Sequence, residues 1–194
     1  PFNKFMEERP GDTGVSQYHF NTAKLNDFLT EFAISKGCTV FDDEIVDVAI
    51  CEHGIDYISS AEERYNYDFY IDCTGFSKLL IGKLGANWNS YSKYLKVKEA
   101  IVFPTPQEEE TPVWTLAKAM DAGWMFRIPV QGRKGNGYIF DSDFITAAEA
   151  QTEVEAYLGH SVEIAKHIKF EPGAIDRPWI KNVCAIGLSA SFVE

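Results

Sequence analysis

Two apolar runs joined by a glycine-rich link constrain the fold of this chain more than any other stretch. The runs GWMFRIPV and GYIF flank residues 132–137, which contain three glycines. Glycine accepts the positive φ angles that tight turns between strands require. A dinucleotide-binding loop would instead need G-x-G-x-x-G between a strand and a helix. The segment therefore predicts a β-hairpin, with Arg133 and Lys134 in solvent at its tip.

The segments on either side of this hairpin predict both helices and strands. Apolar residues recur at helical spacing in NTAKLNDFLTEFAISKG, which Gly37 closes, and in the run from Thr146, a possible N-cap, to Gly159. TGFSKLLIGKLG predicts a turn into a short helix. β-Branched and aromatic runs separated by turns predict strands in CTVF, EIVDVAI, IDYISS, RYNYDFYIDC, LKVKEAIVFP, TPVWTLAKAM and VCAIGL. The sequence thus predicts an α+β fold: a helix with strands, an inserted antiparallel sheet and a return strand.

Charge and apolar run length narrow the possible partners. Asp and Glu number 29 against 18 Lys and Arg, giving a net charge of -11, and no basic run is present. Binding to nucleic acid needs clustered cations that displace counterions from phosphates, so nucleic acid is not an expected partner. The apolar runs are too short for a bilayer about 30 Å thick, and no signal peptide is recognisable. These features predict a cytoplasmic protein without a membrane partner.

The cysteines and histidines do not suggest a metal centre or a disulfide framework. No C-x-x-C spacing is present, and the histidines form no pair on one helix face. We therefore expect buried free thiols in a reducing compartment and no metal site. The four cysteines are Cys38, Cys51, Cys73 and Cys184.

Two glycine turns follow predicted strands, one on each side of the antiparallel insertion. The first is Thr74-Gly75, at the end of YDFYIDC, and the second is Gly187-Leu188-Ser189, after VCAI. Small residues at the carboxyl edge of a sheet allow close approach of a phosphate, ribose or flavin. Either turn alone is equally typical of ordinary strand ends. Their occurrence as a pair favours a ligand-binding edge.

Alternation along GWMFRIPV places large aromatic side chains together. With a period of two, Trp124, Phe126 and Ile128 share one face of the strand, and Met125 and Arg127 share the other. Such a pair of aromatics can be part of a core. It can also form a wall beside a flat cofactor or line a tunnel, since aromatic walls exclude water without adding acid or base groups.

From about Tyr18 to Glu194, the chain resembles the flavin-dependent tryptophan halogenases, a branch of the flavin monooxygenase superfamily. YHFN with the following helix, IDCTGFSKLLI, GRKGNGYIF and WIKNVCAIGLSASFVE are similar to segments of that family. The most specific family motif is G-W-x-W-x-I-P. This chain matches it with Phe126 at the second tryptophan, the other matches being Gly123, Trp124, Ile128 and Pro129.

The resemblance implies an FAD enzyme that chlorinates or brominates an aromatic, tryptophan-like substrate through a flavin hydroperoxide and hypohalous acid. It implies a halide ion as co-substrate and a separate flavin reductase as partner. It places the first glycine-rich turn and the catalytic lysine before Pro1, and the catalytic glutamate after Glu194, so no catalytic residue is assigned and the isolated chain is expected to be inactive. Implied cofactor contacts are Thr74, Gly75, Gly187, Leu188 and Ser189, and implied tunnel-wall residues are Trp124, Phe126, Ile128 and Pro129.

On this interpretation residues 1–194 form a single partial domain. Residues 18–82 and 180–194 supply the cofactor side, and residues 90–179 supply the antiparallel sheet on the substrate side. Two alternatives remain open. The same scaffold could serve a flavin-dependent monooxygenase or hydroxylase, or the chain could be an inert structural fragment that self-associates through apolar surface.

Overall fold

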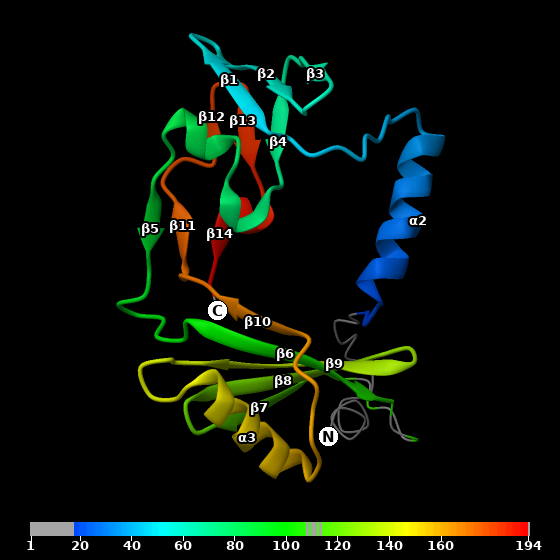
Figure 1. Ribbon diagram of the computed structural model, residues 1–194, viewed down its shortest axis with the longest axis vertical. Helices are drawn as coiled ribbons and strands as arrows, with labels where there is room; N and C mark the ends of the chain where they lie inside the picture. Colours follow the sequence, from blue (N-terminus) through cyan, green and yellow to red (C-terminus); the bar gives the residue numbers. More distant parts are fainter. Residues whose placement is uncertain (1–17, 108, 110–111, 113, 194) are drawn as a thin grey trace, which may run out of the picture. The chain divides into compact units, whose positions relative to one another are not determined.

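The computed structural model describes residues 18–107, 109, 112 and 114–193, which form two compact units (Figure 1). Of these described residues, those within 18–39 and 97–169 belong to the sheet unit, and those within 40–96 and 170–193 belong to the turn unit. Helix α2 (Thr22–Ser35) thus groups with the antiparallel sheet, and residues 170–179 group with the return strand. No helix among the described residues is long and apolar enough to cross a membrane.

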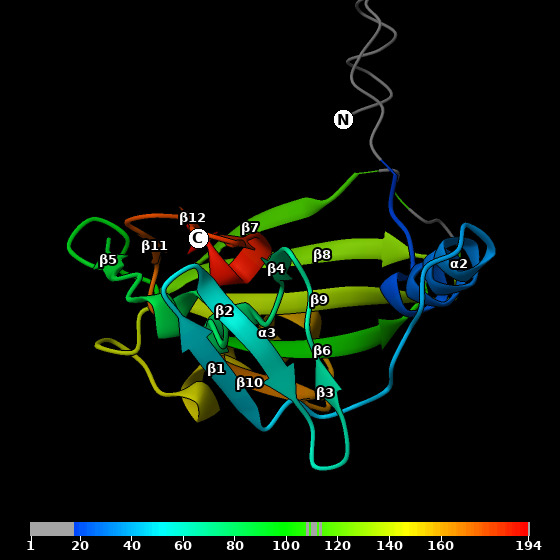
Figure 2. The same cartoon turned by 90° about the horizontal axis from the view of Figure 1, so that it is seen from above.

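The sheet unit is built on five antiparallel strands that lie side by side (Figure 2). Their order is β10 (Lys166–Lys169), β6 (Glu99–Pro106), β9 (Arg133–Phe140), β8 (Gly123–Val130) and β7 (Leu116–Met120). The predicted β8–β9 hairpin is confirmed, but its turn contains only Gln131 and Gly132, because Val130 already pairs with Arg133. The expected solvation of Lys134 is therefore wrong: it lies within β9 and is only 3% exposed.

Helix α3 (Ala147–Leu158), which was predicted with its Thr146 cap, packs on one face of this sheet. The Thr146 side chain and Glu149 form a reciprocal capping box, and Gly159 ends the helix in a left-handed conformation. Met125, Tyr138 and Phe140 from the sheet pack with Ala150 and Val154 from the helix in one buried cluster. This core occupies one face of the sheet, so residues on the alternate register of each strand point away from it.

Helix α2 (Thr22–Ser35) confirms the first helical prediction. Asn21 caps its start by accepting a hydrogen bond from the backbone of Ala23, and Gly37 follows its end with φ of +91°. None of its residues is buried.

The turn unit contains three small sheets. One is the antiparallel set β1 (Asp47–Cys51), β2 (Gly54–Ser59) and β3 (Arg64–Tyr65). The second places β13 (Val183–Ala185) between β4 (Tyr70–Asp72), with which it runs parallel, and β12 (Trp179–Ile180). The third consists of β14 (Ser191–Phe192), β11 (Gly173–Ile175) and β5 (Trp88–Ser90). The predicted return strand is thus confirmed as β13.

Three further expectations from the sequence are wrong. CTVF is not a strand, because it pairs with no described strand. Val40 and Phe41 are consequently 54% and 55% exposed. TGFSKLLIGKLG forms two 3₁₀ turns, η1 (Gly75–Ser77) and η2 (Ile81–Leu84), instead of a turn and one short helix. The four cysteines are free but not buried: Cys184 is half-buried and the other three are exposed.

Candidate functional site

The two glycine turns lie at the ends of neighbouring parallel strands in the turn unit. Ala185 of β13 pairs with Asp72 of β4, so Gly75 and Gly187 follow the same edge of the sheet. Their φ angles are +67° and +60°, and a Cβ atom built on either glycine would have no atom within 4 Å. Both backbones therefore border open space, which a ligand can enter.

Asp72 joins these turns through one buried carboxylate. Its Oδ2 accepts hydrogen bonds from the backbone N–H groups of Leu80 at 2.9 Å and Ile81 at 2.8 Å. Its Oδ1 accepts from the Thr74 N–H at 2.9 Å, the Thr74 hydroxyl at 2.7 Å and the Ser189 hydroxyl at 3.2 Å. The residue is 0% exposed. One side chain thus holds η1, the start of η2 and η3 (Gly187–Ser189) together.

These hydrogen bonds keep Asp72 ionised. Burial alone would raise the pKa of its carboxyl, but hydrogen bonds from the Ile81 backbone and from Thr74 outweigh burial and hold the pKa below the ordinary 3.8. A carboxylate that accepts several N–H and O–H bonds is stabilised in its charged form. The turns are therefore tied together by a permanent negative charge at neutral pH.

Thr74 and Ser189 use their hydroxyl groups inside the protein. The Thr74 hydroxyl donates to Asp72 and accepts from the Leu79 N–H at 2.8 Å. The buried Ser189 hydroxyl also lies 3.1 Å from the Gly75 carbonyl oxygen, so its proton is shared between two acceptors. Leu188 instead is 42% exposed. A ligand at the open side of this edge would consequently meet the glycine backbones and Leu188. The hydroxyls of Thr74 and Ser189 instead fix the conformation of the two turns.

The aromatic pair lies on the face of β8 that points away from the α3 core. Trp124 and Phe126 are both half-buried, with ring centroids 6.1 Å apart and planes inclined at 56°. Ile128 continues the same face, since β8 pairs with β9 without a register shift. The rings are tilted instead of stacked. Pro129, expected beside them, is buried on the opposite face.

Gly137 makes room for the Phe126 ring. The two residues are cross-strand partners, and a Cβ on Gly137 would lie 2.4 Å from Cζ of Phe126. The ring therefore lies across the neighbouring strand with its edge over a backbone that carries no side chain. On the β7 side, Phe126 pairs with Ala117, another small residue. The result is an apolar surface that can exclude water but cannot transfer a proton.

Asp72 and Gly137 are the contributors that the sequence analysis did not assign. Along β4, Asp72 shares the inward register of buried Tyr70, and exposed Ile71 lies between them. An acidic residue in an inward position was therefore the available signal in the sequence. Gly137 has no such local signal, because its role depends on the residue opposite it on β8.

Comparisons with known proteins agree on one family. The sequence model described as "Tryptophan halogenase" matches residues 3–194. The 7-chloro-L-tryptophan 6-halogenase of Kutzneria sp. (strain 744) is 35% identical over 202 residues, covering 99% of this chain and 39% of that protein. The tryptophan 6-halogenase of Streptomyces toxytricini is 32% identical over 203 residues, covering 100% of this chain and 39% of that protein.

Solved structures agree with the sequence matches. The crystal structure of the Streptomyces toxytricini enzyme matches with a TM-score of 0.84 and 31% identity, covering 89% of this chain and 37% of that chain. A flavin-dependent halogenase from Brevundimonas sp. BAL3 matches with a TM-score of 0.81 and 28% identity, covering 87% of this chain and 36% of that chain. The chain spans 39% of the length of each of the two curated relatives.

Proposed function

This chain belongs to the tryptophan halogenase family, and on that premise we propose that the protein serves FAD-dependent halogenation of an aromatic, tryptophan-like substrate. Chloride or bromide is the halogen source, hypohalous acid is the halogenating agent, and a separate flavin reductase delivers reduced FAD. The similarity to two tryptophan 6-halogenases supports the reaction class, and the similarity to a flavin-dependent halogenase supports the cofactor.

The arrangement of Trp124 and Phe126 carries this proposal. Both rings lie on the sheet face that the α3 core does not use, and Gly137 leaves the space that Phe126 occupies. In the proposed enzyme they form an apolar wall that keeps water from the path of the halogenating agent. Ile128 extends this wall, whereas Pro129 supports it from the other face of β8.

The turn unit supplies backbone suited to FAD. Open space beside Gly75 and Gly187 fits a close approach of a dinucleotide or flavin edge, and Asp72 holds both turns at fixed spacing. When bound, FAD supplies the oxygen-dependent redox chemistry. We assign the Gly75 and Gly187 backbones and Leu188 to its contact surface. Thr74 and Ser189 act as positioning residues behind that surface.

Truncation of Trp124 tests the wall. In the complete protein supplied with FAD, reductase, halide and tryptophan, Trp124→Ala is expected to lower halogenated product about ten- to a hundredfold, as for a lost positioning contact. Peroxide release should rise, because the oxidant is no longer confined. The melting temperature should change little, since Trp124 lies outside the α3 core. Product, peroxide and melting temperature are measured on one preparation.

Trp179→Ala is the matched control, because Trp179 is 65% exposed and lies in the turn unit. It should leave the ratio of product to peroxide unchanged. If Trp124 is an ordinary core residue, its truncation costs roughly 3–5 kcal/mol of stability instead. A large fall in melting temperature with an unchanged ratio of product to peroxide would contradict the proposed wall.

Phe126 favours a second candidate function, flavin-dependent hydroxylation on the same scaffold. It replaces the second tryptophan of the family motif and so removes an indole N–H from the wall. The same assay with halide omitted separates the two functions. Oxygenated product that is independent of halide supports hydroxylation, and product that requires halide supports halogenation.

A further inference from the structure

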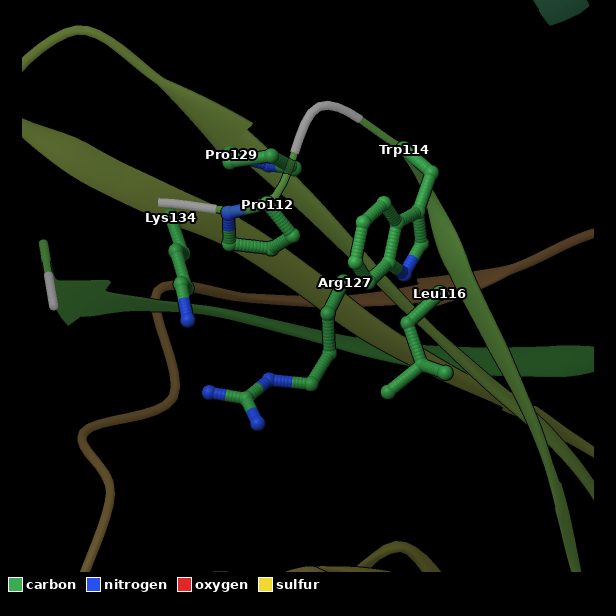
Figure 3. Close-up of a pocket in the computed structure, with 6 residues that line it drawn as sticks. All are labelled: Pro112, Trp114, Leu116, Arg127, Pro129 and Lys134. Atoms are coloured by element: carbon green, nitrogen blue, oxygen red, sulfur yellow. The ribbon is translucent and has the colours of Figure 1, made fainter. Parts of the chain in front are cut away.

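A small pocket lies in the sheet unit, on the side of the sheet that also carries α3. Its volume is about 230 Å³, and it lies beside β7, β8 and β9 (Figure 3). The residues that line it are Pro112, Trp114, Leu116, Arg127, Pro129 and Lys134. None of these residues belongs to the aromatic wall.

Strand register places the pocket on the face opposite Trp124 and Phe126. Arg127 follows the core residue Met125 by two positions and pairs with Leu116 on β7 and Asn136 on β9. Pro129 continues this face and pairs with Lys134. A ligand in the pocket would therefore be separated from the aromatic wall by the thickness of the sheet.

Two cations are held at the pocket by the surrounding structure. Nε of Arg127 donates to Oδ1 of Asn136 at 3.3 Å. Asn136 is 0% exposed, and its amide nitrogen donates to the Phe103 carbonyl at 3.1 Å and the Thr105 hydroxyl at 3.0 Å. The Arg127 and Lys134 side chains extend from their strands to the same side, as Figure 3 shows. Each also makes a further interaction within the protein, which an incoming anion would supplement or exchange.

The remaining walls of the pocket are apolar. Trp114 contributes a half-buried indole, and Leu116 and the two prolines complete the lining. An indole offers a flat surface on which a ring can stack. The pocket thus combines a place for negative charge with a place for a planar apolar group.

We propose that this pocket binds a small aromatic monocarboxylate. A guanidinium group can hold both oxygens of a carboxylate, and the ammonium of Lys134 adds a second positive charge. The ring of the ligand lies against Trp114 and the prolines. A pocket of about 230 Å³ is suited to a single-ring compound, since sites for drug-sized ligands begin near roughly 300 Å³. The paired cations distinguish this pocket within a chain whose net charge is -11.

Benzoate is the probe, and the indole N–H signals of ¹⁵N-tryptophan-labelled complete protein report its binding. Trp114→Phe and Trp124→Phe assign the two relevant signals. Benzoate should shift the Trp114 signal with a dissociation constant below about 1 mM, on the usual affinity scale. The Trp124 signal should stay in place, because that residue lies on the other face of the sheet.

Two further probes in the unaltered protein separate charge from shape. Benzamide keeps the ring without the charge, and acetate keeps the charge without the ring. Each should bind at least about tenfold more weakly than benzoate, a difference equivalent to about 1.4 kcal/mol. Equal binding of benzamide would overturn the role of the cations. An absent or unsaturable Trp114 shift, or one accompanied by Trp124, would overturn the pocket itself.

Arg127→Gln tests the principal cation. It should weaken benzoate binding at least about tenfold while leaving benzamide binding unchanged, consistent with loss of one charge-assisted contact. Arg133→Gln is the matched control, because Arg133 is exposed on the same hairpin. Unchanged benzoate affinity in Arg127→Gln would contradict the proposal, and the probe comparison remains decisive if that variant does not fold.

Discussion

Replacement of Asp72 by alanine is expected to destabilise the protein by about 3–5 kcal/mol, the range for breaking a buried charged network. The backbone N–H groups of Leu80 and Ile81 and the hydroxyls of Thr74 and Ser189 all lose this acceptor. Buried donors without an acceptor carry their full desolvation cost. Asp72→Asn should also destabilise, because an amide NH₂ group can only donate where one carboxylate oxygen accepts.

Thermal and urea unfolding of the complete protein measure this effect. Asp68→Ala is the control, since Asp68 is an exposed carboxylate just before β4. It should change stability by no more than about 0.5 kcal/mol. Similar losses for both variants would show that the Asp72 network contributes nothing specific to the turn unit.

Acid should remove the same contribution from the unaltered protein. The pKa of Asp72 is lowered in the folded state, so its stabilising effect is fully present above the unfolded value and is lost as the pH falls through the folded value. The carboxyl of an aspartate in an unfolded chain has a pKa of about 3.9. Below that pH, the melting temperature of the unaltered protein should therefore fall more steeply than that of Asp72→Asn. Parallel curves would contradict the assignment.

Gly123→Ala is expected to cost about 3 kcal/mol, the upper part of the usual range for overpacking. A Cβ at this position would lie 2.0 Å from the Ile139 carbonyl oxygen and 2.9 Å from Cα of Phe140. Both atoms belong to the backbone of β9, so no side-chain rotation can relieve the contact. Strands β8 and β9 would have to separate where β8 begins, next to Trp124.

Gly135→Ala is the matched control for this substitution. Its Cβ would meet only Nη1 of Arg133 at 3.4 Å and the Ile128 carbonyl at 3.9 Å, and the first of these belongs to a flexible side chain. We expect a change within about 1 kcal/mol, typical of a mild strand substitution. Thermal unfolding of both variants decides the point. Equal melting temperatures would show that the approach of β9 to Gly123 does not limit the sheet.

Local signals account for the parts of the fold that the sequence predicted well. Helices α2 and α3 have apolar periodicity and caps at both ends, all contained in a short segment. The prediction of a strand at CTVF was wrong. β-Branched and aromatic residues indicate strand propensity, but they do not indicate whether another strand is available to pair with the segment and bury it. The hairpin loop was predicted to be longer than it is. Gly135 and Gly137 were assigned to the loop but lie within β9, where Gly137 accommodates Phe126.

The candidate site was predictable only where strand geometry determines it. The two glycine turns were expected to belong together, and the parallel pairing of β4 with β13 brings them to one edge. The inward orientation of Thr74 and Ser189 could not be predicted, because it depends on hydrogen bonds to Asp72. Pro129 was assigned to the wall through the family motif, although simple alternation along β8 separates it from Trp124.

The pairing of β4 with β13 also affects the order in which the chain can fold. The hydrogen bond between Asp72 and Ser189 joins residues 117 positions apart, and every strand of the five-stranded sheet lies between them. Closing a long loop costs chain entropy before any contact compensates for it. The intervening strands are also synthesised before β13 and can pair among themselves first. We therefore expect the antiparallel sheet to form early and the edge that bears Gly75 and Gly187 to assemble last.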